Sequence, residues 1–261
     1  MSRVAIVTGV SRRRGIGFAV ARRLLDDGLR VVIQSWPAHD AEQPWGADPD
    51  GVPALLEELG GAGPRLAHVE ADLAGPAAPA RVVEHAVATF GAIDVLVANH
   101  ARSSASTLQD VTAQELDRSW AVNARAVVLL VQAYAARHDP ARAGGRVVLF
   151  TSGQHLAPMT GELAYAVTKG AVHQMARTLA DALADRGVTL NAINPGPVDT
   201  GWPSDALREQ LSAQFPRGHW GRPEDVAAVV AWLASAQSAQ ITGQVIDAEA
   251  GFRRHAPGCG G

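Results

Sequence analysis

Short apolar runs recur along the chain and alternate with longer amphipathic stretches. The runs are rich in β-branched residues, a composition typical of strands that are buried on both faces of a parallel sheet. The stretches between them are long enough for helices that connect successive parallel strands. The pattern predicts a doubly wound parallel α/β sheet with helices on both faces and about seven strands, near residues 3–8, 30–35, 65–70, 93–98, 146–151, 188–193 and 244–248.

One segment interrupts this alternation. Residues 35–53 contain four prolines and two tryptophans and are longer than a usual strand-to-helix connection. We expect this polar segment to be either a mobile surface loop or a cover over a ligand. The chain shows no internal repeat and no linker, so we expect a single domain over residues 1–261.

A glycine-rich turn follows the first apolar run. The sequence RVAIVT leads into TGVSRRRGIG and then into FAVARRLLDDG, which has the composition of a helix. Glycines in this context allow a tight turn and let a pyrophosphate approach the amino end of the helix. Gly9, Gly15 and Gly17 are suited to this task, and the order of strand, turn and helix predicts a nucleotide site.

A second chemical signal combines a serine, a tyrosine and a lysine. Ser152 follows the apolar run RVVLFT, and Tyr165 and Lys169 come next at a spacing of four residues. If residues from Leu163 onward form a helix, both side chains lie on one face of it. A neighbouring cation lowers the pKa of a phenol, whose ordinary value is about 10, toward the range useful for proton transfer.

Composition narrows the function classes. The chain is 47% apolar and 19% charged with a formal charge of −3, and no basic stripe indicates a nucleic-acid partner. No apolar run has the length of a signal or a membrane span, so we expect a cytoplasmic protein with no membrane contact. The single cysteine, Cys259, cannot form an internal disulfide, and we expect no metal site.

Taken in order, these motifs resemble the short-chain dehydrogenase/reductase family in its single-domain form. TGVSRRRGIG is similar to the family's T-G-x-x-x-G-x-G turn, and LVANHA stands where L-V-N-N-A-G is usual. Asn123 in WAVN matches the family's helical asparagine. The segments NPGPVDT, GRPEDVAAVVAWLAS and ITGQVIDAEAG resemble its nicotinamide-covering segment, C-terminal helix and last strand.

The resemblance implies a Rossmann-like fold and specific roles. Tyr165 would exchange the proton, Ser152 would bind the substrate oxygen, and Lys169 would lower the pKa of the phenol and bind the nicotinamide ribose. Asn123 would hold a water that links Lys169 to solvent. The residues expected to bind the cofactor are Gly9, Ser11, Arg12, Arg13, Arg14, Gly15, Ile16, Gly17, Ser35, Asp72, Leu73, Asn99, Tyr165, Lys169, Pro195, Gly196, Val198 and Thr200.

The chain departs from the family pattern in two places. Five residues separate Gly9 from Gly15 where three are usual, so we expect residues 12–14 to bulge outward. His100 and Ala101 replace the usual Ala and Gly, which places a titratable ring close to the ligand channel.

The choice of cofactor depends on the end of the second strand. That strand ends at Gln34 and Ser35 without the carboxylate that usually binds the ribose hydroxyls of NAD. The arginines at 12–14 could bind a 2′-phosphate with charge-assisted hydrogen bonds. We therefore expect NADPH. In the alternative, the arginines are solvated and Asp40 or Asp50 binds the hydroxyls of NADH.

The resemblance favours a carbonyl reductase similar to the 3-oxoacyl carrier-protein reductases. The alternatives are an NAD(H)-dependent secondary-alcohol dehydrogenase, a non-catalytic NADP(H) sensor, a sugar-nucleotide dehydratase or epimerase, and an enoyl reductase. The family also forms dimers and tetramers through helices that correspond to residues 112–137 and to the Tyr165 helix, so we expect a homo-oligomer. Candidate contacts to the small-molecule substrate, partly apolar in character, are Gln154, His155, Met159, Glu162 and Trp202.

Overall fold

The computed structural model describes residues 2–142 and 144–254, which form alternating strands and helices. The strands are β1 (Val4–Val7), β2 (Arg30–Ser35), β3 (Leu66–Glu70), β4 (Val95–Ala98), β5 (Gly145–Phe150), β6 (Val188–Asn194) and β7 (Val245–Asp247). The helices are α1 (Ile16–Asp26), α2 (Pro37–Ala41), α3 (Gly51–Glu58), α4 (Ala78–Phe90), α5 (Ala113–Trp120), α6 (Ala126–Arg137), α7 (Leu163–Ala184), α8 (Asp205–Leu211) and α9 (Pro223–Ala234).

The seven strands form one parallel sheet in the order β3-β2-β1-β4-β5-β6-β7. The chain moves outward from β1 in one direction and then returns to continue from β4 in the other. At such a reversal the loops after neighbouring strands diverge and leave a crevice beyond the carboxyl ends of the strands. The sheet therefore places the first turn, after β1, beside the loop after β4.

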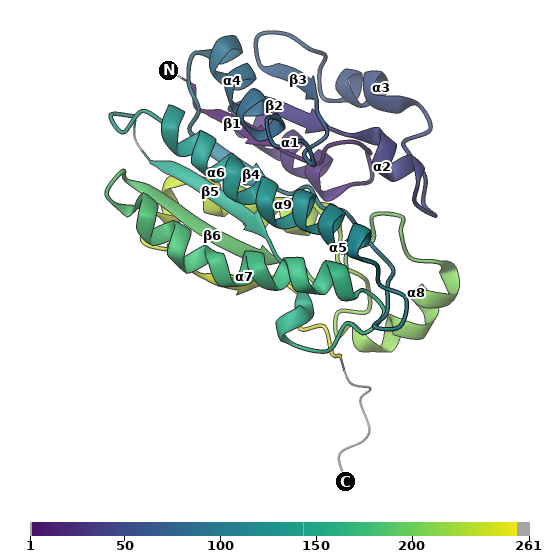
Figure 1. Ribbon diagram of the computed structural model, residues 1–261. Coiled ribbons are helices and arrows are strands. Elements are labelled where there is room, and N and C mark those ends of the chain that lie inside the picture. Colours follow the sequence, from purple (N-terminus) through teal and green to yellow (C-terminus); the bar gives the residue numbers. More distant parts are fainter. Residues whose placement is uncertain (1, 143, 255–261) are drawn as a thin grey trace.

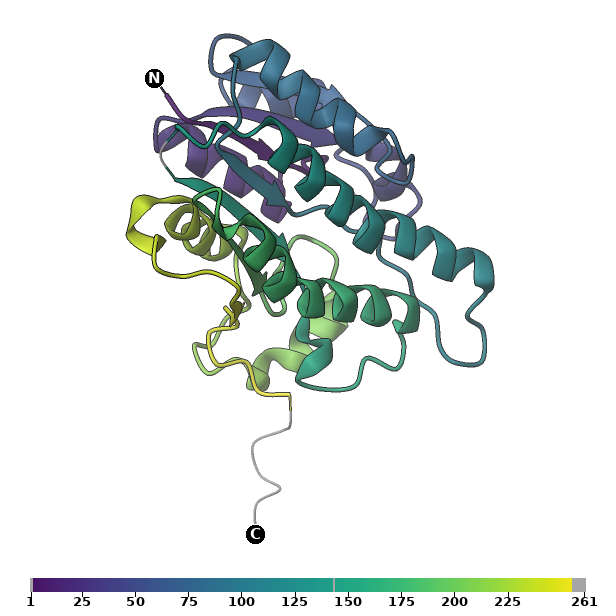
Figure 2. The ribbon, with the colours of Figure 1, turned by 60° about the vertical axis from the view of Figure 1, so that its left-hand side comes forward.

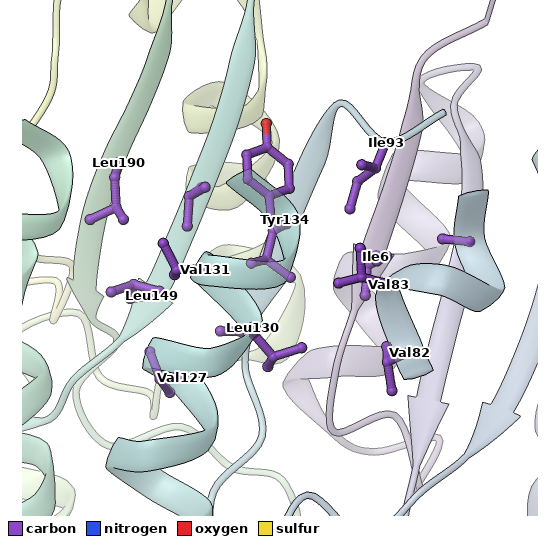
Figure 3. Packing of buried hydrophobic residues seen from close by; sticks show 14 of the residues in the cluster. Ile6, Val82, Val83, Ile93, Val127, Leu130, Val131, Tyr134, Leu149 and Leu190 are labelled. Atoms are coloured by element: carbon purple, nitrogen blue, oxygen red, sulfur yellow. The ribbon is translucent and has the colours of Figure 1, made fainter. Parts of the chain in front are cut away.

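Helices cover both faces of the sheet (Figures 1 and 2). On one face α4, α6 and α7 pack on the strands and enclose the first apolar core. Figure 3 shows its centre, where Leu130 and Tyr134 of α6 lie between Leu149 of β5 and Ile6 of β1. On the other face α1 and α9 pack against each other and form the second core together with Leu55 of α3. Burial on both faces explains why the strands are apolar runs without alternation.

The predicted fold class is confirmed. All seven predicted strands form, with ends within two residues of the expected positions. Helix α7 begins at Leu163, as expected, and α5 and α6 are joined by a π-helical turn, Ala121–Arg125, into one rod (Figure 2). In the part of the chain that the structure describes, no helix is long and apolar enough to cross a bilayer. Cys259 lies outside the described residues.

The proline-rich segment 36–50 is not an unstructured loop. It forms the short helix α2 and then a turn that leads into α3. Its carboxylates reach back to the arginines of the first turn, so that the segment lies against the crevice. Across the crevice, the connection from β6 to α9 contains α8 (Figure 1).

Candidate active site

Close backbone contacts leave no room for a side chain at two glycines of the first turn. Gly9 has φ +73°, and a Cβ there would lie 2.7 Å from the Cα of His100. A Cβ on Gly17 would lie 2.6 Å from the carbonyl oxygen of Gly9. The chain after β1 therefore turns tightly, and α1 begins directly beside it.

The amino end of α1 is suited to an anion. Its N-cap, Gly15, gives no side-chain cap, and the first turn contains no acidic residue; both statements refer to the described residues. The first N–H groups of a helix have no partner within the helix, and its dipole favours negative charge there. Since Ile16 of this turn lines a large cavity, the glycine turn fits the pyrophosphate of a dinucleotide.

The three arginines of the turn are held by carboxylates, which the sequence did not indicate. Arg12 pairs with Asp40 at 2.9 Å and donates to the carbonyl oxygen of Thr200 at 3.0 Å. Arg13 pairs with Asp48 at 2.7 Å and also contacts Asp50. These aspartates come from the segment 36–50, so Arg12 and Arg13 are held at the crevice wall. We expected both arginines to bulge outward, and that expectation is wrong for these two residues.

Arg14 is the arginine that does point toward solvent. Its side chain is 67% exposed and lies 3.5 Å from Asp199. Asp199 also pairs with Arg208 of α8 at 3.1 Å. The lengthened turn thus contacts both the segment 36–50 and the segment that follows β6.

The serine, tyrosine and lysine come together at the carboxyl end of β5. Ser152 and Tyr165 line the same cavity, and the Ser152 hydroxyl is close enough to Tyr165 to affect its pKa. The Nζ of Lys169 lies 5.5 Å from the centre of the Tyr165 ring and donates to the carbonyl oxygen of Phe150 at 2.8 Å. The hydroxyl of Thr151 donates to the carbonyl oxygen of Lys169 at 2.9 Å and so ties α7 to the end of β5.

Burial is the largest cause of the pKa shifts of Tyr165 and Lys169. It raises the pKa of Tyr165 to about 12, with a further contribution from the charge of Glu162, while the hydrogen bond to Ser152 acts in the opposite direction. Burial lowers the pKa of Lys169 to about 8. We had expected the pKa of the phenol to be lowered by its neighbouring cation. The net direction is the reverse, because the phenolate loses more by leaving water than it gains from its surroundings.

Lys169 is the only lysine in the sequence, in which all other basic side chains apart from histidine are arginines. An arginine stays charged at any working pH, whereas a buried lysine shifts its pKa readily. The single lysine therefore lies beside Tyr165 in the cavity, where a cation whose pKa can shift is suited to proton transfer.

Asn123 lies in the π-helical turn between α5 and α6 and forms hydrogen bonds to two neighbouring segments. Its side-chain oxygen accepts from the backbone N–H of Arg102 at 2.6 Å, and its amide donates to the carbonyl of Arg102 and to the hydroxyl of Thr168, both at 3.0 Å. The hydroxyl of Thr168 in turn donates to the carbonyl oxygen of Tyr165 at 2.8 Å. Asn123 therefore connects the π-helical turn to the backbone that carries the tyrosine. A π-helical turn inside an α-helix is rare and frequently marks a functional site.

His100, one of the departures from the family pattern, is a buried structural link. Its Nδ1 lies 2.7 Å from the hydroxyl of Thr8, and its Nε2 lies 3.0 Å from the carbonyl oxygen of Val122. Burial and the charge of Lys169 lower the pKa of His100 to about 3. The ring is therefore neutral at physiological pH, and its Nε2–H donates to Val122. It joins the end of β1 to the π-helical turn.

A cavity of about 950 Å³ unites the two sites. It extends along the glycine turn, the catalytic group and the segment after β6, and its wall contains most of the predicted residues. These are Gly9, Ser11, Arg12, Ile16, Asp72, Leu73, Asn99, Ser152, Met159, Glu162, Tyr165, Lys169, Pro195, Gly196, Val198, Thr200 and Trp202.

The other predicted residues do not line this cavity in the described part of the chain. The lining of the cavity does not include Gly15, Gly17, Asn123, Arg13 or Arg14. The hydroxyl of Ser35 is 2.8 Å from His68. The amide of Gln154 donates to the hydroxyl of Thr151 at 3.2 Å. His155 stacks on the ring of His173 at 4.6 Å and lies 3.2 Å from Asp247, away from the cavity.

Sequence reasoning also missed part of the wall. The C-terminal stretch supplies Glu249, Phe252 and Arg254, and the guanidinium of Arg254 is paired with the carboxylate of Glu249. Gly153 allows this contact, because any Cβ there would collide with the Arg254 guanidinium. No local sequence signal marks these residues, because their place in the cavity wall depends on the pairing of β7 with β6.

Comparison with known proteins identifies the family. A family model described as enoyl-(acyl carrier protein) reductase matches residues 9–253. An uncharacterized oxidoreductase, YjdA of Bacillus subtilis, is 36% identical over 253 residues, which are 97% of each chain. The protein belongs to the short-chain dehydrogenase/reductase family. It is an NAD(P)-dependent oxidoreductase with the fold and motif order of that family.

The descriptions of two further similar proteins mention NADPH. An NADPH-dependent aldehyde reductase-like protein, chloroplastic, of Arabidopsis thaliana is 34% identical over 258 residues, 96% of this chain and 94% of that protein. The crystal structure of a blue fluorescent protein from a metagenomic library, in complex with NADPH, superposes with a TM-score of 0.84 at 35% identity, covering 96% of this chain and 97% of that one.

Proposed function

We propose that the protein is an NADP(H)-dependent oxidoreductase that interconverts a carbonyl compound and a secondary alcohol, with Tyr165 as the general acid and base. The observation that carries the proposal is that Ser152, Tyr165 and Lys169 line one cavity that continues to the glycine turn. A nucleotide at that turn and a carbonyl at Ser152 would share one space. When bound, the nicotinamide supplies or accepts the hydride.

The chain's own residues provide the proton and the orientation. Ser152 donates a hydrogen bond to the substrate oxygen and so stabilises the negative charge that develops there. Tyr165 delivers its proton to the same oxygen during reduction, and its high pKa keeps the phenol protonated and ready to donate. Lys169 supplies positive charge beneath the ring, and Asn123 fixes the backbone of the tyrosine through Thr168.

The preference for NADPH is supported by the wall at the end of β2. Gln34 accepts from the N–H of Gly9 at 3.0 Å in the place where NAD-binding chains usually carry a carboxylate. Arg12 lines the cavity beside it, and its guanidinium would bind a 2′-phosphate in exchange for its contact with Asp40. Two relatives named for NADPH point the same way.

The pairing of Arg12 with Asp40 favours the second candidate, an NAD(H)-dependent alcohol dehydrogenase. Asp40 lines the same cavity, and its carboxylate already neutralises the arginine. A carboxylate at this place can accept hydrogen bonds from ribose hydroxyls. The two candidates differ in which member of the pair meets the nucleotide.

The substrate class follows from the far end of the cavity. Met159, Trp202, Leu211 and Phe252 give it a largely apolar wall near Ser152. We propose a partly apolar ketone or 3-oxoacyl compound. Reduction of a carbonyl is favoured over reduction of an enoyl group by the spacing of four between Tyr165 and Lys169, since the enoyl reductases related to this family space the two residues more widely.

We further propose a homo-oligomer. Leu116 and Trp120 of α5, Val128 of α6 and Val167 of α7 are large apolar side chains that the described chain leaves exposed. They lie on the helices that the family resemblance assigns to subunit contacts.

The replacement of Tyr165 by Phe tests the proposed function. The Tyr165→Phe variant should bind NADPH as tightly as the wild type, measured by nucleotide fluorescence, because the ring is kept and only the hydroxyl is lost. It should lose at least about 1,000-fold in kcat for any ketone that the wild type reduces, since both proton delivery and the link to Ser152 disappear. Turnover within tenfold of the wild type would refute the assignment. Equal binding of NADH and NADPH by the wild type would remove the cofactor preference.

A further inference from the structure

The carboxylate of Glu162 lies in the catalytic cavity without a partner. Glu162 lines the cavity together with Met159 and Tyr165. Within residues 2–142 and 144–254, its side chain makes no hydrogen bond and no ion pair. Its backbone is fixed, since its N–H donates to the carbonyl of Met159 at 3.1 Å and the neighbouring Leu163 N–H donates to Ser106 at 2.8 Å.

The residue also occupies a position where a different side chain would be expected. Glu162 is the N-cap of α7, where Ser, Thr, Asp or Asn usually accepts a hydrogen bond from the first turn. Glu162 makes no such capping bond. A long carboxylate in place of a short cap gains nothing for the helix by capping, and it reaches into the cavity instead.

Three cations of the cavity wall already have partners other than Glu162. Arg254 is paired with Glu249, Arg102 is paired with Glu115 at 2.9 Å, and Lys169 donates to the carbonyl of Phe150. No arginine or lysine of the described chain forms an ion pair with Glu162. The negative charge next to the catalytic tyrosine is therefore left for a ligand to neutralise.

The side chain of Glu162 is exposed and therefore open to a ligand that enters the cavity. Partial burial raises its pKa, and the carboxylate shares the cavity with Pro158, Met159, Leu211 and Phe252. A carboxylate with no protein partner gains free energy when a cation or an N–H donor reaches it and forms a charge-assisted hydrogen bond. A second carboxylate in the same space would be repelled.

We propose that Glu162 determines specificity by binding a protonated amine on the substrate, so that the enzyme acts on amino ketones and amino alcohols in preference to keto acids. The carbonyl would lie at Ser152 and Tyr165 and the ammonium group at Glu162, a few bonds away along a flexible chain. This inference rests on the proposed function, because it places the amine relative to a carbonyl held at Ser152.

Three methyl ketones of matched shape test the proposal. 5-(Dimethylamino)pentan-2-one carries a cation, 6-methylheptan-2-one is its neutral isostere, and 5-oxohexanoate carries a carboxylate at the same distance from the carbonyl. The wild type should reduce the amine with a kcat/KM at least about tenfold above that for the carboxylate, the size expected for a charge-assisted hydrogen bond in a partly solvated cavity. The ratio between substrates cancels any change in the protonation of Tyr165, which all three share.

The Glu162→Gln variant keeps the shape and removes the charge, so its ratio of amine to carboxylate should fall below about threefold. Glu162→Lys should invert the order. Glu84→Gln, on the exposed surface of α4, is the matched control and should keep the ratio of the wild type. A wild type that treats amine and carboxylate alike, or a Glu162→Gln variant that keeps the original ratio, would overturn the proposal.

Calorimetric titration of the NADPH-loaded protein with the same three compounds separates this inference from the proposed function. Selective binding of the amine without turnover would support the role of Glu162 and would count against the reductase. Turnover of all three ketones without selectivity would support the reductase and refute the role of Glu162. If none of the compounds binds, the cavity does not accept the proposed class and the inference fails.

Discussion

The buried lysine gives the most direct test of the electrostatic argument. Burial lowers the pKa of Lys169 from 10.5 to about 8, which corresponds to about 3 kcal/mol of free energy that disfavours the charged form in the folded protein. Replacement by Met keeps the length and apolar stem of the side chain and removes this charge. It also leaves the carbonyl oxygen of Phe150 without its donor, which costs about 2 kcal/mol.

At pH 7 the first effect exceeds the second, so the Lys169→Met variant should be more stable than the wild type by about 1 kcal/mol. For a chain of this size the midpoint of thermal unfolding should rise by about 2–4 °C. Urea unfolding measures the free energy of unfolding directly. The same variant should lose almost all turnover, a gain in stability at the expense of the active site.

The sign of the difference should reverse with pH. The folded pKa of Lys169 lies below its unfolded value, so the cost of burying the charge is complete below about pH 8 and is relieved as the pH rises toward 10.5. At pH 9.5 the wild type has regained about 2 kcal/mol, since each unit is worth about 1.4 kcal/mol. The variant should then be less stable than the wild type by about 1 kcal/mol. A stability difference that does not change with pH would refute the reasoning.

The sequence offers an independent readout of the same pKa. Because Lys169 is the only lysine, protein labelled with lysine that carries 13C only at Cε gives one side-chain resonance that needs no assignment. That resonance should titrate near pH 8. The rate of carbonyl reduction should decline above the same pH as Lys169 loses its proton, while His100, with a pKa of about 3, contributes nothing in this range.

Two further predictions concern the cofactor wall and the assembly. Asp40→Asn frees Arg12 from its carboxylate, so NADPH should bind about threefold to tenfold more tightly in a fluorescence titration. If Asp40 instead binds ribose hydroxyls, NADPH affinity will stay unchanged and NADH will bind more weakly. Light scattering of the purified protein should show a dimer or tetramer, and a monomer at micromolar concentration would count against the apolar surface on α5, α6 and α7 as a subunit contact.

The fold was predictable from the sequence because each of its signals is local. Apolar runs such as Val4–Val7 are buried on both faces, and their pattern does not depend on distant partners. Gly9 and Gly17 were also marked by a local signal, the order of strand, turn and helix, although part of the chain that crowds them comes from Asn99 and His100 after β4. The spacing of Tyr165 and Lys169 placed both residues on one helix in advance.

What could not be predicted depends on contacts between remote segments. Arg13 and Asp48 are 35 residues apart, and their pairing depends on how the segment 36–50 folds back. His155 is close to Ser152 in sequence, but a short 3₁₀ turn directs its ring toward His173 and Asp247. The direction of the pKa shift of Tyr165 depends on burial, which no motif reports.

The lengthened first turn makes contacts with two segments that are remote in the sequence. Arg12 reaches Asp40 on one wall of the crevice and the backbone of Thr200 on the other. Arg14 approaches Asp199 and packs so closely on Gly201 that a Cβ there would lie 3.1 Å from the guanidinium carbon. A turn of ordinary length would not carry these arginines. The lengthened turn therefore contacts both the segment 36–50 and the segment after β6, so that one insertion holds the two walls of the nucleotide site.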